Sequence, residues 1–120
     1  VMILLVEHDD SLRTVLKYFL ENECKVDCLD AKDLNQAFKL LLNFKFTHFL
    51  LDYEIGDNTI LPLLDFMALC PFRNRPIYIL LTDYTTAKNL DIDYVFEKPL
   101  SSRDMDQLLN IVCEEKRCIY

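Results

Sequence analysis

The sequence predicts an α/β fold of three layers, in which a parallel β-sheet lies between two layers of helices. Five short apolar runs are almost continuously hydrophobic, which is typical of strands covered on both faces. Segments with helical periodicity lie between these runs, and such alternation implies right-handed crossovers. At 120 residues the chain has the length of one domain, large enough to bury a substantial core.

The predicted strands coincide with the apolar runs, at residues 2–6, 25–29, 48–51, 77–81 and 94–96. Helices are predicted where apolar residues recur at spacings of three and four, at residues 12–20, 33–43, 60–69 and 102–115. The first helix is preceded by three capping candidates, Asp9, Asp10 and Ser11. We interpret the apolar stripes of all four helices as core-facing.

The connection between the fourth and fifth strands is unusually short. Residues 83–93 provide 11 positions, whereas a complete crossover with its helix needs at least ~10–12. We therefore expect the fourth helix, counted along a regular alternation, to be short or missing.

Composition excludes several classes of function. The net charge of −7, from 13 basic and 20 acidic residues, argues against a nucleic-acid surface. No apolar run approaches the ~18–20 residues of a membrane span, and no signal segment is evident, so we expect a cytoplasmic protein. The chain begins with Val1 rather than Met, and we expect residues 1–120 to be one domain of a longer protein.

Four chemically useful residues follow predicted strands. In an open parallel sheet the ligand site lies outside the carboxyl ends of the strands. Those positions hold Glu7, Asp52, Thr82 and Lys98. Two acids, a hydroxyl and a lysine together form a set suited to phosphoryl transfer.

Each residue of this set has a role in such chemistry. Asp52 can be the nucleophile and a cation ligand, while Glu7 and the backbone carbonyl of Glu54 can supply further oxygens to Mg²⁺. Lys98 can pair with the phosphate as a point charge, and Thr82 can donate its hydroxyl.

Four segments carry a resemblance to a known family: "ILLVEHDDSLR", "FLLDYEIGDN", "ILLTDY" and "VFEKPL". In order and spacing they resemble the signature regions of the response-regulator receiver domain of two-component signalling. The resemblance implies a five-stranded sheet of order 2-1-3-4-5 and phosphorylation of Asp52 by a partner histidine kinase or phosphotransfer protein. It also implies an Mg²⁺ requirement, contacts of Thr82 and Lys98 with the phosphoryl group, and a cis Lys98-Pro99 peptide.

The sequence departs from this family at three places. His8 stands where a second acid normally contacts the metal, and neutral imidazole is a poor ligand for Mg²⁺. We therefore expect weakened Mg²⁺ binding, with Mn²⁺ as the alternative cation. His8 has three readings: a simple replacement, a pH sensor, or a ligand for a softer metal. The short connection falls on the fourth helix, and Val95 occupies the position of the aromatic switch residue.

These observations leave several functions open. The leading interpretation is a phosphoacceptor signalling domain, not a conventional enzyme, with an output domain in the same chain as one option. The alternative is a degenerate receiver that binds partner proteins without phosphorylation. A phosphatase of the haloacid-dehalogenase type has the same order of Asp, Thr and Lys, but it needs a later acid for which only Asp104 and Asp106 are available.

Overall fold

The computed structural model describes residues 1–83 and 90–113. Five parallel strands form one sheet in the order β2-β1-β3-β6-β7. They are β1 (Met2–Val6), β2 (Asp27–Ala31), β3 (His48–Asp52), β6 (Ile77–Thr82) and β7 (Tyr94–Glu97). Counted along the sheet's own strands this is the predicted order 2-1-3-4-5, which is confirmed.

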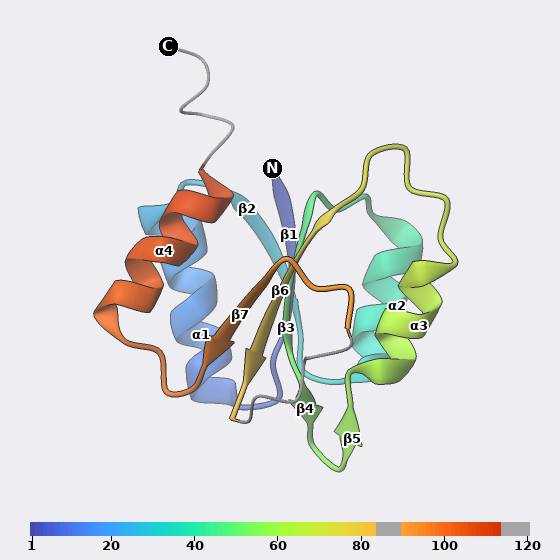
Figure 1. Cartoon of the computed structure of the whole chain (residues 1–120), viewed down its shortest axis with the longest axis horizontal. Helices are drawn as coiled ribbons and strands as arrows, with labels where there is room; N and C mark the ends of the chain where they lie inside the picture. The colour runs from blue at the N-terminus through green and yellow to red at the C-terminus, as the bar shows by residue number, and fades with distance from the viewer. Residues whose placement is uncertain (84–89, 114–120) are drawn as a thin grey trace.

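Helices cover both faces of the sheet and make the three predicted layers (Figure 1). On one face lie α1 (Asp10–Tyr18) and α4 (Ser102–Val112), and on the other lie α2 (Leu34–Asn43) and α3 (Leu61–Ala68). Each face has its own cluster of buried apolar side chains. Leu5 and Ile79 point toward α1 and α4, whereas Leu4 and Leu80 point toward α2 and α3. Alternate side chains of the central strands therefore hold the two helical layers.

The helix ends follow from local capping. The Asp9 carboxylate accepts a hydrogen bond from the backbone N–H of Leu12 at 2.8 Å, and Asp33 caps α2 in the same way. Ser101 and Asp104 form a reciprocal capping box at the start of α4. Of the three capping candidates before the first helix, Asp9 is the one that caps it.

The second strand begins two residues later than predicted. Lys25 has a φ of +58°, and the N–H of Val26 donates to the carbonyl of Leu20, so the chain is still turning where the apolar pattern begins. A π-helical turn, η1 (Phe19–Glu23), continues α1 up to this bend. Periodicity did not predict this turn, because it ends the helix and no further apolar residues follow it in the helix to reveal a change of period.

A small hairpin follows β3 and was also not predicted. It consists of β4 (Glu54–Ile55) and β5 (Asn58–Thr59), joined through Gly56, whose φ is +62°. The hairpin lies at the end of the molecule where the strands of the main sheet point, at the bottom of Figure 1.

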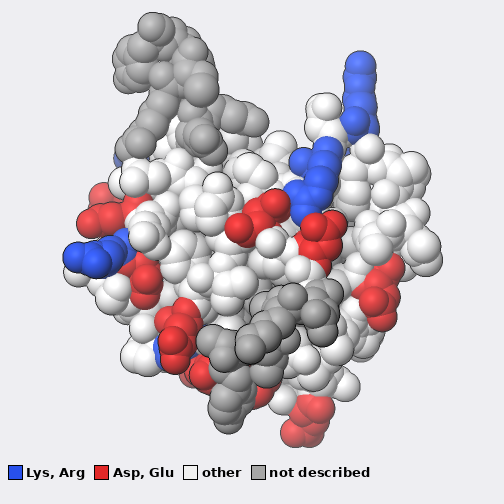
Figure 2. Space-filling model, in the orientation of Figure 1, with Lys and Arg blue, Asp and Glu red and all other residues white. Residues whose placement is uncertain are grey.

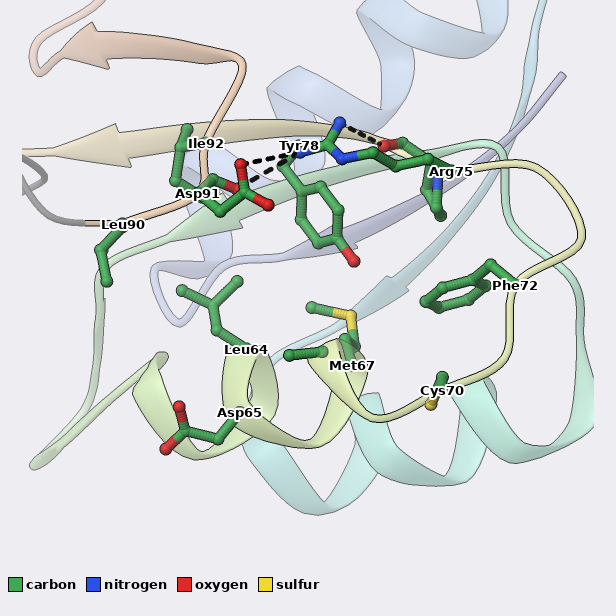
Figure 3. Close-up of a pocket in the computed structure, with 12 residues that line it drawn as sticks. Leu64, Asp65, Met67, Cys70, Phe72, Arg75, Tyr78, Leu90, Asp91 and Ile92 are labelled. Carbon is green, nitrogen blue, oxygen red and sulfur yellow. Dashed lines mark hydrogen bonds and ion pairs between the residues drawn. The ribbon is translucent and has the colours of Figure 1, made fainter.

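Ion pairs hold the end of the short connection between β6 and β7 against the sheet. Arg75 pairs with Asp93 at 2.8 Å and with Asp91 at 3.4 Å, and its guanidinium lies 5.1 Å from the centre of the Tyr78 ring (Figure 3). Asp93 in turn accepts a hydrogen bond from the N–H of Tyr78 at 2.8 Å. The expectation of a short or missing fourth helix concerns residues 84–89, which lie outside the described part of the chain, as do residues 114 and 115 at the predicted end of the last helix.

Candidate functional site

The predicted strand-end residues lie at the carboxyl edge of the sheet. Glu7 follows β1 and Asp52 ends β3, and these neighbouring strands flank the point where the chain reverses its direction across the sheet. This switch point is where open α/β sheets bind ligands. Thr82 ends β6 beside β3, and Lys98 follows β7.

Burial distinguishes these side chains from ordinary surface groups. Glu7, Asp52 and Thr82 are 1%, 3% and 2% exposed. Among the described residues, His48 is the one other polar residue buried to this degree. It is the first residue of β3 and so lies at the amino ends of the strands, away from this site. Burying carboxylates costs free energy unless they are paired, so such a concentration at one edge indicates a functional role.

Lys98 brings the set together. Its ammonium nitrogen lies 2.6 Å from Asp52 Oδ2 and 3.7 Å from Glu7 Oε1, and its backbone N–H donates to the carbonyl of Thr82 at 2.9 Å. Burial lowers the pKa of Lys98, but the hydrogen bond from its ammonium group to Asp52 and the charges of Asp52 and Glu7 outweigh burial and raise it. The ammonium group is therefore charged at neutral pH. The peptide bond from Lys98 to Pro99 is cis, as the resemblance predicted.

Glu7 is the buried carboxylate whose hydrogen bonding is incomplete. Its Oε2 accepts a hydrogen bond from the N–H of Asp9 at 3.1 Å, whereas its buried Oε1 has no hydrogen-bond partner among the described residues. Burial, followed by the neighbouring Asp52 carboxylate, raises the pKa of Glu7 to about 7. The site thus contains two adjacent carboxylates and one ammonium group, with an oxygen left available for a further ligand.

The donor set fits a hard cation that retains water. Mg²⁺ is commonly held by one or two carboxylates while waters and phosphate oxygens complete the octahedron. Glu7 and Asp52 provide the carboxylates. Oε1 of Glu7 has only the ion pair with Lys98 at 3.7 Å and no hydrogen bond among the described residues, so it is the kind of atom that a cation would satisfy. The loop carrying the Glu54 carbonyl is tied to the site, because the N–H of Glu54 donates to Asp52 Oδ1 at 3.3 Å.

His8 does not join these acids. Its ring packs against the hairpin turn, where a Cβ on Gly56 would lie 3.4 Å from His8 Cε1, and its Nδ1 is 3.4 Å from the carbonyl oxygen of Lys32. In the described ranges, no three His, Cys, Asp or Glu side chains converge as a metal site. The His8 ring thus lies between the hairpin turn and the carbonyl of Lys32.

Arg13 belongs to the support of this site and was not predicted. Its guanidinium donates to the carbonyl of Glu7 at 3.0 Å, to Asp30 at 3.1 Å and to Asp10 at 2.6 Å. The side chain is 15% exposed and holds the backbone between β1 and α1 against β2. The only sequence signal for it is the spacing of Asp10 and Arg13, three positions apart on one helix.

A mainly apolar groove of about 650 Å³ adjoins the site between α1 and α4. Lys98 contributes to its wall, together with Leu12, Val15, Pro99, Leu100 and Met105. Val15 is 57% exposed, so part of the apolar stripe of α1 faces solvent rather than the core, contrary to our interpretation of that stripe. A protein segment placed in this groove would lie next to Asp52.

The acids proposed for a phosphatase are differently placed. Asp104 is engaged in the capping box of α4, and Asp106 is exposed on the same helix. Neither follows a strand of the described sheet. At the switch position, Val95 is 46% exposed, with Tyr94 at 40% and Phe96 at 6%.

No protein-family model and no curated protein sequence matches this chain. The solved structures, in contrast, include many similar folds. A CheY-like response-regulator receiver domain protein from Methanospirillum hungatei superposes with a TM-score of 0.78 at 22% identity, covering 97% of this chain and 96% of that one. The N-terminal domain of an uncharacterized protein from Wolinella succinogenes gives a TM-score of 0.81 at 18% identity, covering 100% and 99%.

The response regulator TrrA from Thermotoga maritima, solved in complex with Mg²⁺ and BeF, has a TM-score of 0.74 at 19% identity, covering 92% of this chain and 97% of that one. The chain therefore has the receiver-domain fold over nearly its whole length, as the four signature segments predicted. No helix in the described part of the chain is both long and apolar enough to cross a membrane.

Proposed function

We propose that this chain is a phosphoacceptor receiver domain in which Asp52 accepts a phosphoryl group from a phosphohistidine on a kinase or phosphotransfer protein. The observation that carries the proposal is the buried Asp52 carboxylate, held 2.6 Å from the ammonium group of Lys98 beside Glu7 at the switch point of a receiver fold. The receiver-like fold supports the proposal, because signalling by phosphorylation is what the resemblance implies for this architecture.

The chemistry requires little from the protein except positioning and charge. A carboxylate oxygen of Asp52 attacks phosphorus, the bond from phosphorus to the donor imidazole breaks, and its electron pair leaves with the imidazole. The product is an aspartyl phosphate. Lys98 pairs with the Asp52 carboxylate before transfer and can pair with the phosphate oxygens afterwards. The hydroxyl of Thr82 is the candidate hydrogen-bond donor to a further phosphate oxygen.

A divalent cation completes this scheme. Glu7, Asp52 and the carbonyl of Glu54 are the groups that would hold Mg²⁺, which neutralises phosphate oxygens when bound. With two carboxylates rather than three, we expect weaker binding than a full acidic corner would provide. Mn²⁺ accepts imidazole as well as oxygen ligands and is the alternative cation.

The groove between α1 and α4 supports docking of the donor. Its apolar residues lead directly to Lys98, and a helix presenting a phosphohistidine could bury an apolar face there. The domain would then pass the signal on by changed affinity for a partner or for an output domain.

The test is incubation of the chain with acetyl phosphate and millimolar Mg²⁺ or Mn²⁺, followed by intact-mass measurement. We expect the added mass of one phosphoryl group, its removal by hydroxylamine, and its absence in Asp52→Asn. Asp57→Asn is the matched control, because Asp57 is an exposed acid in the hairpin turn nearby. An unmodified wild-type mass with both cations, or a modified Asp52→Asn, would refute the proposal.

A second candidate function is a degenerate receiver that binds partners without phosphorylation. It is favoured by the contacts of the His8 ring with Gly56 and the Lys32 carbonyl, and by the exposed Val95 at the switch position. The discriminating observation is the phenotype of Asp52→Asn in the full-length protein. Unchanged signalling would favour this second function, whereas loss of signalling favours phosphorylation.

A further inference from the structure

The amino ends of β3 and β6 border a groove at the opposite end of the sheet from Asp52. Its volume is about 730 Å³, and it lies between the end of α2 and the loop that joins α3 to β6. Its apolar rim is unusually accessible, with Leu42 72% exposed, Phe44 47% and Phe66 37%. Exposed apolar groups gathered in one place indicate an interaction site rather than random surface composition.

The charges of the groove are all of one sign. Lys45, Arg73 and Arg75 line it, and no Asp or Glu does. Arg75 is already paired with Asp93, so Lys45 and Arg73 are the basic groups that a ligand would meet first. Figure 2 shows Lys and Arg side chains at the upper right, over the region of the loop between α3 and β6, with Asp or Glu side chains directly below them.

Two segments of the sequence carry basic residues without any acidic residue. Residues 34–51 and 66–82 contain four basic residues and no acid, while the remainder of the chain contains nine basic and 20 acidic residues. The fold brings residues 41–48 of the first segment and residues 66–77 of the second segment together at the groove. Cations near the carboxyl end of a helix are stabilised by its dipole, but neither α2 nor α3 has a basic residue in its last turn. Balancing helix ends does not require the neighbouring apolar side chains to be exposed.

The local structure selects the kind of partner. Both β3 and β6 are paired on each side within the sheet, so an extended peptide finds no strand edge here to pair with. A helix needs only a groove and a few side-chain anchors. Another copy of this chain is disfavoured by its net charge of −7 spread over the rest of the surface, which opposes close self-association.

A neighbouring cavity shows the contrast. On the other side of the loop between α3 and β6, a cavity of about 430 Å³ includes Asp65, Asp91 and the engaged Arg75 in its lining (Figure 3). Its charges are mixed and largely satisfied within the protein.

We propose that the groove between α2 and the loop joining α3 to β6 binds an acidic amphipathic helix of a partner protein. The apolar face of the helix contacts Leu42, Phe44 and Phe66, and its acidic residues face Lys45 and Arg73. The groove lies at the amino ends of the strands, so it remains available when the donor occupies the groove beside Asp52.

The probes are two labelled helical peptides of about 18 residues, or five turns, that share one Leu/Phe face and carry Glu or Lys on the other. Fluorescence anisotropy with the intact chain measures their affinities. We expect the Glu peptide to bind at least roughly tenfold more tightly than the Lys peptide, with affinity falling as salt rises. Amide chemical-shift changes should map to residues 41–48 and 66–77.

Variants locate the binding independently of the fold. Lys45→Glu and Arg73→Glu should each weaken binding of the Glu peptide several-fold, and Leu42→Ser should do so without affecting the charge. Arg103→Glu, on an exposed position of α4 in the other helical layer, is the control and should leave the affinity unchanged. Circular dichroism of each variant establishes that it is folded.

Several outcomes would overturn the proposal. These are equal affinity for the Glu and Lys peptides, an equal effect of Arg103→Glu, or shift changes confined to the groove between α1 and α4. Self-association that Leu42→Ser abolishes would assign the groove to a second copy, and binding to phosphatidylserine vesicles lost in the same variants would assign it to a membrane surface. None of these outcomes depends on phosphorylation of Asp52.

Discussion

Replacing Glu7 by Gln should stabilise the protein at mildly alkaline pH, although it removes a residue of the candidate site. In the native fold Glu7 is 1% exposed, and one of its oxygens has no hydrogen-bond partner among the described residues. Above neutral pH it must hold a negative charge beside Asp52. A Gln at this position has a similar shape, carries no charge, and can donate a hydrogen bond from its amide to the Asp52 carboxylate.

The magnitude follows from the pKa of Glu7, which is about 7 in the fold against an ordinary value of 4.5. Between these values the folded chain binds more protons than the unfolded chain, so its stability falls as pH rises. At ~1.4 kcal/mol per pKa unit, the loss is about 3 kcal/mol once the pH exceeds 7. Glu7→Gln removes this loss. We expect it to be more stable by up to about 3 kcal/mol near pH 8, and nearly equal to the wild type near pH 4.5.

Urea unfolding followed by far-UV circular dichroism, repeated across this pH range without added metal, measures the difference. Glu54→Gln is the matched control, because Glu54 is an exposed acid beside the site and should show no such profile. Millimolar Mg²⁺ should stabilise the wild type more than Glu7→Gln, since a ligand that binds the native state raises its stability. A pH-independent difference between the proteins, or a Gln variant less stable than the wild type near pH 8, would contradict the reasoning.

Three further substitutions test neighbouring parts of the site. Lys98→Met leaves Asp52 and Glu7 without the ammonium group that pairs with them. The same urea experiment should show a free energy of unfolding lower by about 3–5 kcal/mol near pH 8, and a much smaller decrease near pH 4.5. Arg13→Lys keeps the charge but loses the forked hydrogen bonds to the Glu7 carbonyl and Asp30, so the urea midpoint should fall by the equivalent of about 1–3 kcal/mol, and an unchanged midpoint would show that the fork is dispensable. Gly56→Ala should lower the free energy of unfolding by about 1 kcal/mol, because the φ of Gly56 is +62°. Adding His8→Ala should not restore this stability. Full recovery in the double variant would instead assign the loss to contact between the new Cβ and the His8 ring.

The sequence was most informative where burial dictates the pattern. The strand at residues 2–6 coincides with β1, which lies inside the sheet between β2 and β3, so both of its faces had to be apolar. The second strand is at the sheet edge, where Asp27 and Asp30 are tolerated, so the apolar run at residues 25–29 placed the strand two residues too early. The choice at Lys25 depends on the preceding π-helical turn, which leaves no periodic signal.

In the candidate site, positions set by the strands were predictable and contacts between distant residues were not. Strand ends placed Glu7, Asp52, Thr82 and Lys98 at one edge, because parallel strands bring their carboxyl ends together. The direction of His8 could not be predicted, since it depends on contacts with Gly56 and Lys32, which are distant in the sequence. Arg13 was overlooked for the same reason, because it lies in α1 and its partner Asp30 lies in β2, 17 positions along the chain.

The separation of charge along the strands has a consequence for how the domain meets other molecules. Acidic groups such as Glu7, Asp9 and Asp52 lie at the carboxyl edge of the sheet, while Lys45 and Arg73 lie at the amino edge. These charges contribute a dipole along the strands, which Lys98 at the carboxyl end and Asp93 at the amino end reduce. In a partner's field such a dipole experiences a torque that turns the domain before contact, and dissolved salt screens it beyond about 8–10 Å. A basic partner is thus met with the end that carries Asp52, and an acidic partner with the opposite end.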